Sequence, residues 1–171
     1  MSDRANLRCS YNEDAVRHKG FYNDENFIKS LAEICYDDFF KRPEDIDFAY
    51  NHADVLLCGA CHVFAVALQE KLGYNLYVIE EILESEWTER KGFHAFCQVN
   101  ESNRLYYVDA RGMTSSFDEF MEVARQFVHG EYIIRPALPE ELAEWKKEDY
   151  YKEASYFAES IIEKYKECYT L

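Results

Sequence analysis

Apolar residues recur along this chain with two different periods. After Cys61, the residues Ala65, Leu68 and Leu72 lie at helical spacing, and Gly73 stands where such a helix would stop. This pattern predicts a buried helix that begins at Cys61. The same spacing predicts further helices over 24–41, from 117 or 118 to about 128, and in two segments of the charged C-terminal part from 139 onward.

Alternating apolar and polar positions predict β-strands. Phe93–Val99 and Leu105–Asp109 flank the polar stretch Asn100–Asn103 and predict an antiparallel hairpin. If this four-residue loop is symmetric and free of bulges, His94 lies directly opposite Asp109, with Cβ atoms about 4.5–5.5 Å apart. Two further strands are predicted, over 74–82 and, at a sheet edge because of its proline, over 131–136.

Together these elements predict a single α+β domain, in which the helix that begins at Cys61 packs on a small antiparallel sheet. Residues 1–23 are polar and irregular and predict an N-terminal arm. Residues 24–135 would form the core, and residues 136–171 the C-terminal helices. The helix over 24–41 and the C-terminal helices would flank the core, the latter by packing across the sheet.

The composition agrees with one folded domain and narrows its partners. The 171 residues, 48% of them hydrophobic, are enough for a sizeable core. A net charge of −14 argues against direct binding to nucleic acid or to a membrane surface, but it suits a basic protein partner. Six cysteines at irregular spacing, with no apolar signal segment or membrane-length apolar run, predict a reducing, cytoplasmic setting. We expect no cofactor.

Three residues predict nucleophilic chemistry. Because the backbone N–H groups at a helix N-terminus favour an anion, they would stabilise the thiolate of Cys61 and lower its pKa from about 8.5. The same amides, at Ala60 and Cys61, could hold a developing oxyanion. His94 would act as the base, and Asp109 would hold its imidazole in one tautomer. The pattern therefore predicts a Cys-His-Asp catalytic triad.

The segments that carry these residues resemble a known family. Cys61-x-x-Phe64-Ala65, His94-Ala95-Phe96 and Val108-Asp109 are similar to the Cys, His, Asp pattern of the transglutaminase-like group within the papain-like cysteine hydrolases. The resemblance covers roughly residues 54–112 and includes Gly59, two residues before the nucleophile. It implies a papain-like core and a thiol hydrolase or acyltransferase acting on an amide, ester or thioester of a protein or peptide-like substrate. Hydrolysis, deamidation and amide transfer would share these residues.

Further residues are candidates for oxyanion or substrate contacts. Trp87, in an acidic segment shortly before His94, would either bind substrate or anchor its loop to the core. Arg111 could pair with Asp109, bind a substrate carboxylate or clamp a carbonyl in a turn. The second oxyanion donor that the resemblance implies has three upstream candidates: Tyr50, Asn51 and His52.

Other interpretations of the same residues stay open. The run from Cys58 to His62 also matches a c-type haem attachment pattern, which would need an exported chain, and a thioredoxin-type Cys-x-x-Cys redox motif. Cys58, Cys61, His94 and Cys97 could bind zinc, although the odd spacing of His94 and Cys97 predicts opposite faces of a strand. In the simplest alternative, the cysteines and His94 are ordinary core residues. The alternative from another functional class is a non-catalytic acidic protein that sequesters a basic or nucleic-acid-binding partner.

Overall fold

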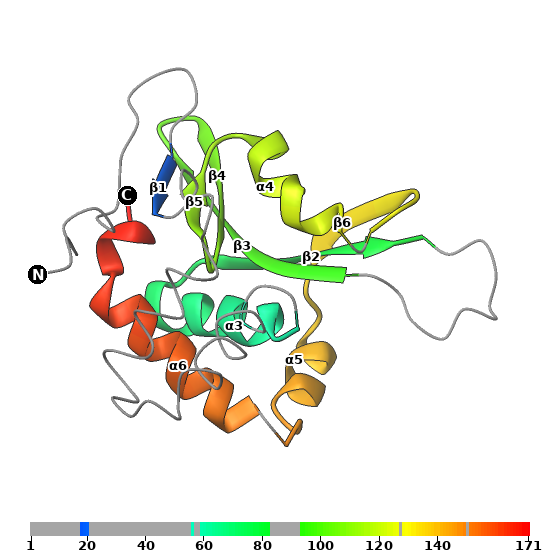
Figure 1. Ribbon diagram of the computed structural model, residues 1–171, viewed down its shortest axis with the longest axis vertical. Coiled ribbons are helices and arrows are strands. Elements are labelled where there is room, and N and C mark those ends of the chain that lie inside the picture. Colours follow the sequence, from blue (N-terminus) through cyan, green and yellow to red (C-terminus); the bar gives the residue numbers. More distant parts are fainter. Residues whose placement is uncertain (1–17, 21–55, 57–58, 83–92, 127, 150) are drawn as a thin grey trace, which may run out of the picture.

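The computed structural model describes residues 18–20, 56, 59–82, 93–126, 128–149 and 151–171 (Figure 1). Their strands are β1 (His18–Gly20), β2 (Asn75–Glu81), β3 (Phe93–Glu101), β4 (Arg104–Asp109), β5 (Gly112–Thr114) and β6 (Tyr132–Pro136). Their helices are α3 (Cys61–Leu72), α4 (Phe117–Ala124), α5 (Pro139–Trp145) and α6 (Tyr151–Lys164), followed by the short 3-10 helix η4 (Lys166–Cys168). The predicted α+β class is confirmed.

These strands form one open sheet in the order β1-β5-β4-β3-β2-β6, with all neighbours antiparallel. The prediction of an irregular arm over 1–23 is wrong at β1, which pairs with β5. Gly20 and Gly112 face each other in this pair, and both have positive φ, 93° and 113°. A Cβ on Gly112 would collide with the carbonyl oxygen of Lys19, so the close approach of these short strands depends on glycine.

Helices cover both faces of the sheet (Figure 1). α3 packs on the face of β3 that carries Ala95 and Cys97, and α4 packs on the opposite face, against Phe96. α6 lies along α3, where Ala158 and Ile161 join the same buried cluster. The prediction that the C-terminal helices pack across the sheet is therefore wrong for α6, because α3 already covers that face.

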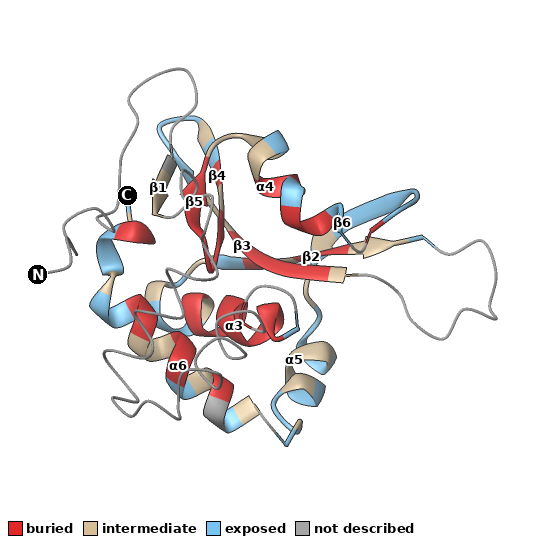
Figure 2. Ribbon diagram, in the orientation of Figure 1, coloured by how far each residue is buried: buried red, intermediate tan, exposed pale blue. Residues whose placement is uncertain are grey.

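α3 begins at Cys61 and ends at Leu72, as the sequence predicts. Every residue over Cys61–Leu68 is buried, because this part of the helix lies between the sheet and α6 (Figure 2). Gly73 follows with a φ of 73°, and its N–H donates to the carbonyl oxygen of Gln69, a left-handed cap that suits glycine. The helix therefore places its N-terminus, with Cys61, at a buried position beside the sheet.

The β3–β4 hairpin turns more tightly than the sequence predicts. The polar stretch Asn100–Asn103 predicts a four-residue loop, but the turn consists of Ser102 and Asn103 alone, and Glu101 faces Arg104. Both turn residues have positive φ, 51° and 62°. Two left-handed residues match the twist of the flanking strands, which makes the two-residue turn favourable.

The tighter turn shifts the register of the hairpin by two positions. Val99 faces Tyr106, where the predicted loop would place it opposite Arg104. The prediction that His94 and Asp109 are direct cross-strand partners is therefore wrong. Because side chains alternate with a period of two, a shift of two nevertheless leaves both residues on one face of the sheet.

The region after β4 combines a missed strand with confirmed elements. β5 has no counterpart among the strands that the sequence predicts. α4 begins at Phe117, as predicted, and the side-chain oxygen of Ser116 caps it by accepting a hydrogen bond from the N–H of Glu119, but the helix ends at Ala124, before the predicted end. β2 is confirmed, and β6 is confirmed as an edge strand that ends at Pro136.

Two expectations concern the chain as a whole. The helix predicted over 24–41 lies outside the described residues. Within the part of the chain that the structure describes, no helix combines the length and the apolar character needed to cross a bilayer.

Candidate active site

Cys61 occupies the first position of α3. Ala60 is the N-cap residue, and its carbonyl oxygen accepts a hydrogen bond from the N–H of Val63. The sulfur of Cys61 accepts a hydrogen bond from the backbone N–H of Ala95 on β3, with a nitrogen–sulfur distance of 3.4 Å. The thiol is only 5% exposed and lies beside His94, the residue that precedes Ala95.

The sulfur reaches β3 at a place where the ladder with β4 has ended. β3 pairs with β4 from Glu101–Arg104 to Cys97–Val108, whereas its pairing with β2 continues as far as Phe93. In the described ladders, the edge of β3 beyond Cys97 is therefore open toward β4, and the N–H of Ala95 donates to Cys61 instead. This opening is where the N-terminus of α3 meets the strand that carries His94.

His94 and Asp109 form a buried imidazole–carboxylate pair. Nε2 of His94 lies 3.0 Å from Oδ2 of Asp109, and the two side chains are 0% and 3% exposed. An ionised carboxylate can only accept, so Nε2 of His94 donates to Asp109. The contact forms in spite of the shifted register.

The imidazole of His94 lies on the α4 face of the sheet. Its ring packs against Phe96 and Phe120, with centroids 6.5 and 5.7 Å away. Because α3 lies on the opposite face, the sulfur and the imidazole do not share a face of the sheet, and the sulfur bonds the strand through the N–H of Ala95. The sequence pattern places His94 and Asp109 on one face but carries no information on which helix covers it.

Arg111 holds the carboxylate of Asp109 from a further side. Its Nε and Nη2 donate to Oδ1 at 3.1 Å and to Oδ2 at 2.8 Å, and its backbone N–H donates to Oδ1 at 2.9 Å. Nη1 and Nη2 also donate to the carbonyl oxygens of Glu119 and Phe120 on α4. Of the roles that the sequence leaves open for Arg111, the structure thus shows the pairing with Asp109, and the carbonyls that Arg111 clamps lie on α4 and not in a turn.

The charge of Arg111 fixes the ionisation of its partner. Burial raises the pKa of the Asp109 carboxyl, but the guanidinium of Arg111 and the hydrogen bonds from His94 and Arg111 outweigh burial and hold this pKa well below its usual range. Asp109 is therefore a carboxylate at neutral pH, as its hydrogen bond to the imidazole requires.

The thiol and the imidazole shift each other toward their charged forms. Burial raises the pKa of Cys61, but hydrogen bonding to His62 and His94 outweighs it and lowers this pKa to about 6. Burial lowers the pKa of His94, but hydrogen bonding to Asp109 and to Cys61 raises it to about 9. At neutral pH both shifts favour a thiolate beside an imidazolium, the reactive state of a nucleophilic cysteine.

His62 belongs to the same site, although the sequence motifs do not assign it a catalytic role. Its Nε2 lies 2.8 Å from Oε2 of Glu148, and its ring lies near Phe93 and Trp145, with centroids 6.1 and 5.2 Å away. Burial lowers the pKa of His62, but hydrogen bonds to Cys61 and Glu148 raise it above its usual value. One signal was available: a histidine within the apolar run of a buried helix needs polar partners.

Cys97 lies on the other face of β3 from His94, as their odd spacing predicts. Its thiol donates to the carbonyl oxygen of Ala65 on α3 at 3.3 Å, and burial raises its pKa. From these positions Cys97 and His94 cannot ligate one zinc ion. Among the described residues, no group of three or more cysteine, histidine or acidic side chains is arranged to hold a metal.

Several candidates are not placed. Tyr50, Asn51, His52, Cys58 and Trp87 lie outside the described residues. The second oxyanion donor and the haem and redox motifs, which need Cys58, therefore remain predictions.

The oxidation state of Cys168 differs from the one that a reducing environment predicts. This residue is buried in η4 and disulfide-bonded, and its partner lies outside the described residues. Because disulfides persist mainly in oxidising compartments, this bond counts against the predicted reducing environment. Cys61 and Cys97, in contrast, are free thiols.

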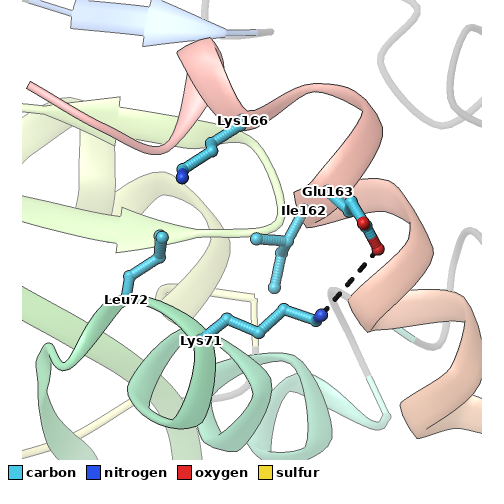
Figure 3. A pocket seen from close by; sticks show the side chains of 5 residues that line it. All are labelled: Lys71, Leu72, Ile162, Glu163 and Lys166. Atoms are coloured by element: carbon cyan, nitrogen blue, oxygen red, sulfur yellow. Dashed lines mark ion pairs between the residues drawn. The ribbon is translucent and has the colours of Figure 1, made fainter.

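A small surface cavity lies at the far end of α3 (Figure 3). Its volume is about 190 Å³, and its lining residues come from the last turn of α3, the end of α6 and the start of η4: Lys71, Leu72, Ile162, Glu163 and Lys166. With a rise of about 1.5 Å per residue, the helix separates this cavity from Cys61 by roughly 15 Å. The cavity is therefore separate from the candidate active site.

No protein-family model, curated protein or solved structure matches this chain. The geometry and the electrostatics of the site therefore carry the functional argument.

Proposed function

We propose that this protein is a cysteine-dependent hydrolase or acyltransferase that acts on an amide, ester or thioester through Cys61, His94 and Asp109. One observation carries the proposal. The sulfur of Cys61 accepts a hydrogen bond from the N–H of Ala95 at 3.4 Å, and the imidazole of His94, the residue before Ala95, bonds the buried carboxylate of Asp109 at 3.0 Å. An ordinary core would not gather a thiol, an imidazole and a carboxylate at one helix N-terminus, because burying polar groups costs free energy.

In the first half of the proposed reaction, the thiolate of Cys61 attacks the carbonyl carbon of the substrate, and a carbon–sulfur bond forms. The N–H groups at the start of α3, at Ala60 and Cys61, are the proposed donors to the oxyanion. The imidazolium of His94 then protonates the leaving group from Nδ1, and the bond from the carbon to the leaving group breaks. Asp109 keeps Nε2 protonated throughout, which fixes the tautomer.

In the second half, water or an amine attacks the thioester carbon, the carbon–sulfur bond breaks and the thiolate returns. Water gives hydrolysis or deamidation, and an amine gives acyl transfer. A protein or peptide-like acyl donor is the proposed substrate class. We propose no cofactor, nucleic-acid or membrane partner, and a cytoplasmic location stays a prediction.

The order of the three residues also supports the proposed papain-like, transglutaminase-like core. Cys61 begins a helix, His94 lies near the start of a strand, and Asp109 ends the next strand. This order agrees with the family pattern that the sequence resembles.

A second candidate function is binding of a basic protein partner. The net charge of −14 favours it, as do three consecutive exposed apolar residues on the edge strand β6: Tyr132, Ile133 and Ile134. Apolar residues surrounded by charge are common at protein interfaces. This function would not require an acidic thiol at Cys61, so thiol chemistry separates the two candidates.

The test is the pH dependence of alkylation by iodoacetamide, with each labelled cysteine located by peptide mass spectrometry. Because only the thiolate reacts, labelling of Cys61 should have a midpoint near pH 6, in contrast to Cys97. His94→Gln should raise the pKa of Cys61 part of the way toward about 8.5, because His62 remains, and should lower its labelling at pH 6 by on the order of tenfold. Limited access to a buried thiol slows labelling at every pH and leaves the midpoint unchanged.

Cys97→Ala is the matched control, because it removes the other free thiol of the described core without touching His94. The Cys61 profile should be the same in this variant. A Cys61 midpoint at or above pH 8.5 in the folded wild type, or one that His94→Gln leaves in place, would contradict the catalytic proposal.

A further inference from the structure

The sulfur of Cys61 interacts with two imidazoles, and each imidazole is bonded to its own carboxylate. The pair of His94 and Asp109 is enclosed, with side chains 0% and 3% exposed. In the second pair, the side chain of His62 is 3% exposed but that of Glu148 is 34% exposed. The two pairs therefore differ in their connection to solvent.

In the part of the chain that the structure describes, the surroundings of His62 offer a polar route outward through Glu148. Among the described residues, the titratable groups that face it are Cys61 on α3 and Glu148 in the turn after α5. β3 and α5 contribute the aromatic rings of Phe93 and Trp145, which stack on each other with centroids 6.4 Å apart. Aromatic rings conduct no protons, so Glu148 is the described group through which His62 can exchange a proton with water.

We infer that His62 and Glu148 form a proton relay between the buried sulfur and solvent, and that His62 is the base that activates water in the second half-reaction. The inference rests on the proposed function and names a further catalytic residue for it. Nε2 of His62 bonds Glu148 at 2.8 Å, which leaves Nδ1, also buried, for the sulfur and for a nucleophile that approaches it.

Proton balance explains why a second pair is useful. When water attacks the acyl-enzyme, a carbon–oxygen bond forms, the carbon–sulfur bond breaks, and release of a carboxylate frees both protons of the water. One proton returns to His94, which gave its proton to the leaving group. The other passes to Nδ1 of His62, while the proton on Nε2 moves to Glu148 and then to solvent. The pair of His94 and Asp109 is enclosed, with side chains only 0% and 3% exposed.

The acyl-enzyme also favours the basic form of His62. In the free enzyme the charge and hydrogen bond of Cys61 help to raise the pKa of His62. Acylation removes the charge from the sulfur, while the burial that lowers this pKa remains. His62 therefore loses its proton more readily when a base is needed.

The test uses p-nitrophenyl acetate with the full chain. The initial burst of p-nitrophenolate measures acylation of Cys61, and the later steady rate measures hydrolysis of the acetyl-enzyme. Glu148→Gln should leave the burst rate within about threefold and lower the steady rate by roughly tenfold or more. His62→Gln should slow the burst as well, because the loss of His62 raises the pKa of Cys61, but it should lower the steady rate further than the burst rate. The pH inflection of the steady rate that belongs to His62 should be absent in His62→Gln.

Glu70→Gln is the matched control. It removes the ion pair between Glu70 on α3 and Lys146, which lies in the same turn as Glu148, and it leaves the contacts of His62 in place. It should behave as wild type in both phases. If Glu148→Gln and Glu70→Gln slowed the burst and the steady rate to the same extent, the relay would be overturned and Glu148 would have a structural role only. Unchanged phases in Glu148→Gln and His62→Gln would also overturn it, while the proposed function would stand. Absence of a burst in wild type, together with a labelling midpoint of Cys61 at or above pH 8.5, would refute the proposed function itself.

Discussion

The two imidazole–carboxylate pairs at Cys61 are held by different kinds of structure. Asp109 ends a strand and is fixed by the side chain and backbone of Arg111, whereas Glu148 lies in a turn after the short helix α5. The first pair is enclosed by the sheet and α4, and the second is open to solvent at its carboxylate. Both imidazoles lower the pKa of Cys61, so the pairs differ in their access to solvent, and in the proposed relay only the second exchanges protons with water.

The enclosed pair is tolerated because its charges alternate. From the sulfur inward, a thiolate is followed by an imidazolium, a carboxylate and a guanidinium, at Cys61, His94, Asp109 and Arg111. Each buried charge has a neighbour of opposite sign, which offsets part of the cost of removing it from water. Glu148 needs less compensation, since water reaches its side chain.

Asp109→Asn should have the largest effect on the free energy of unfolding. It removes the negative charge between His94 and Arg111, and leaving buried charge uncompensated costs about 3–5 kcal/mol. The pKa of Asp109 is depressed in the fold, so its contribution is complete above the unfolded pKa of about 3.9 and is lost as the pH falls below it. Urea unfolding should therefore show a deficit at pH 7 that shrinks below about pH 4.

Asp118→Asn provides the same chemical change at an exposed ion pair. Asp118 bonds Arg125 at 3.1 Å, with side chains 90% and 55% exposed. Its loss should cost less than about 1 kcal/mol. Equal destabilisation by the two substitutions would mean that the enclosed pair is no better organised than a surface contact.

The sequence predicted this site where the information was local. The apolar spacing and Gly73 located both ends of α3. An even number of residues separates His94 from Asp109, and in an antiparallel hairpin with an even-numbered loop this places both side chains on one face of the sheet. That prediction survived an error in register, because a shift of two positions preserves the face. The helical spacing likewise located the start of α4 at Phe117.

What the sequence missed depends on contacts between distant segments. β1 forms only because Gly20 and Gly112 allow two backbones to approach, and three residues are too few to show an alternating pattern. The tight turn depended on the backbone angles of Ser102 and Asn103, which a polar stretch does not reveal. The role of His62 depends on Glu148, which lies 86 positions further along the chain.

Proton exchange should separate the two pairs directly. In proton NMR spectra of the folded protein at pH 7, the Nε2 proton of His94 should give a persistent downfield resonance, because its site is enclosed. The Nε2 proton of His62 should exchange with water too quickly to persist, since its carboxylate partner is exposed. His94→Gln and His62→Gln assign the signals. Equal persistence of both protons would show that the second pair is as closed as the first.

Glu148→Gln should have the smallest effect on stability and the opposite pH dependence to Asp109→Asn. The amide oxygen can still accept from Nε2 of His62, and the exposed site limits the loss to less than about 1 kcal/mol. The pKa of His62 is raised in the fold, so its pairing with Glu148 contributes below the unfolded pKa of about 6.5 and is lost as the pH rises through the folded value. Urea unfolding should therefore show a small deficit near pH 6 that disappears at higher pH. A deficit that instead grows with pH would indicate that Glu148 stabilises the fold through a group other than His62.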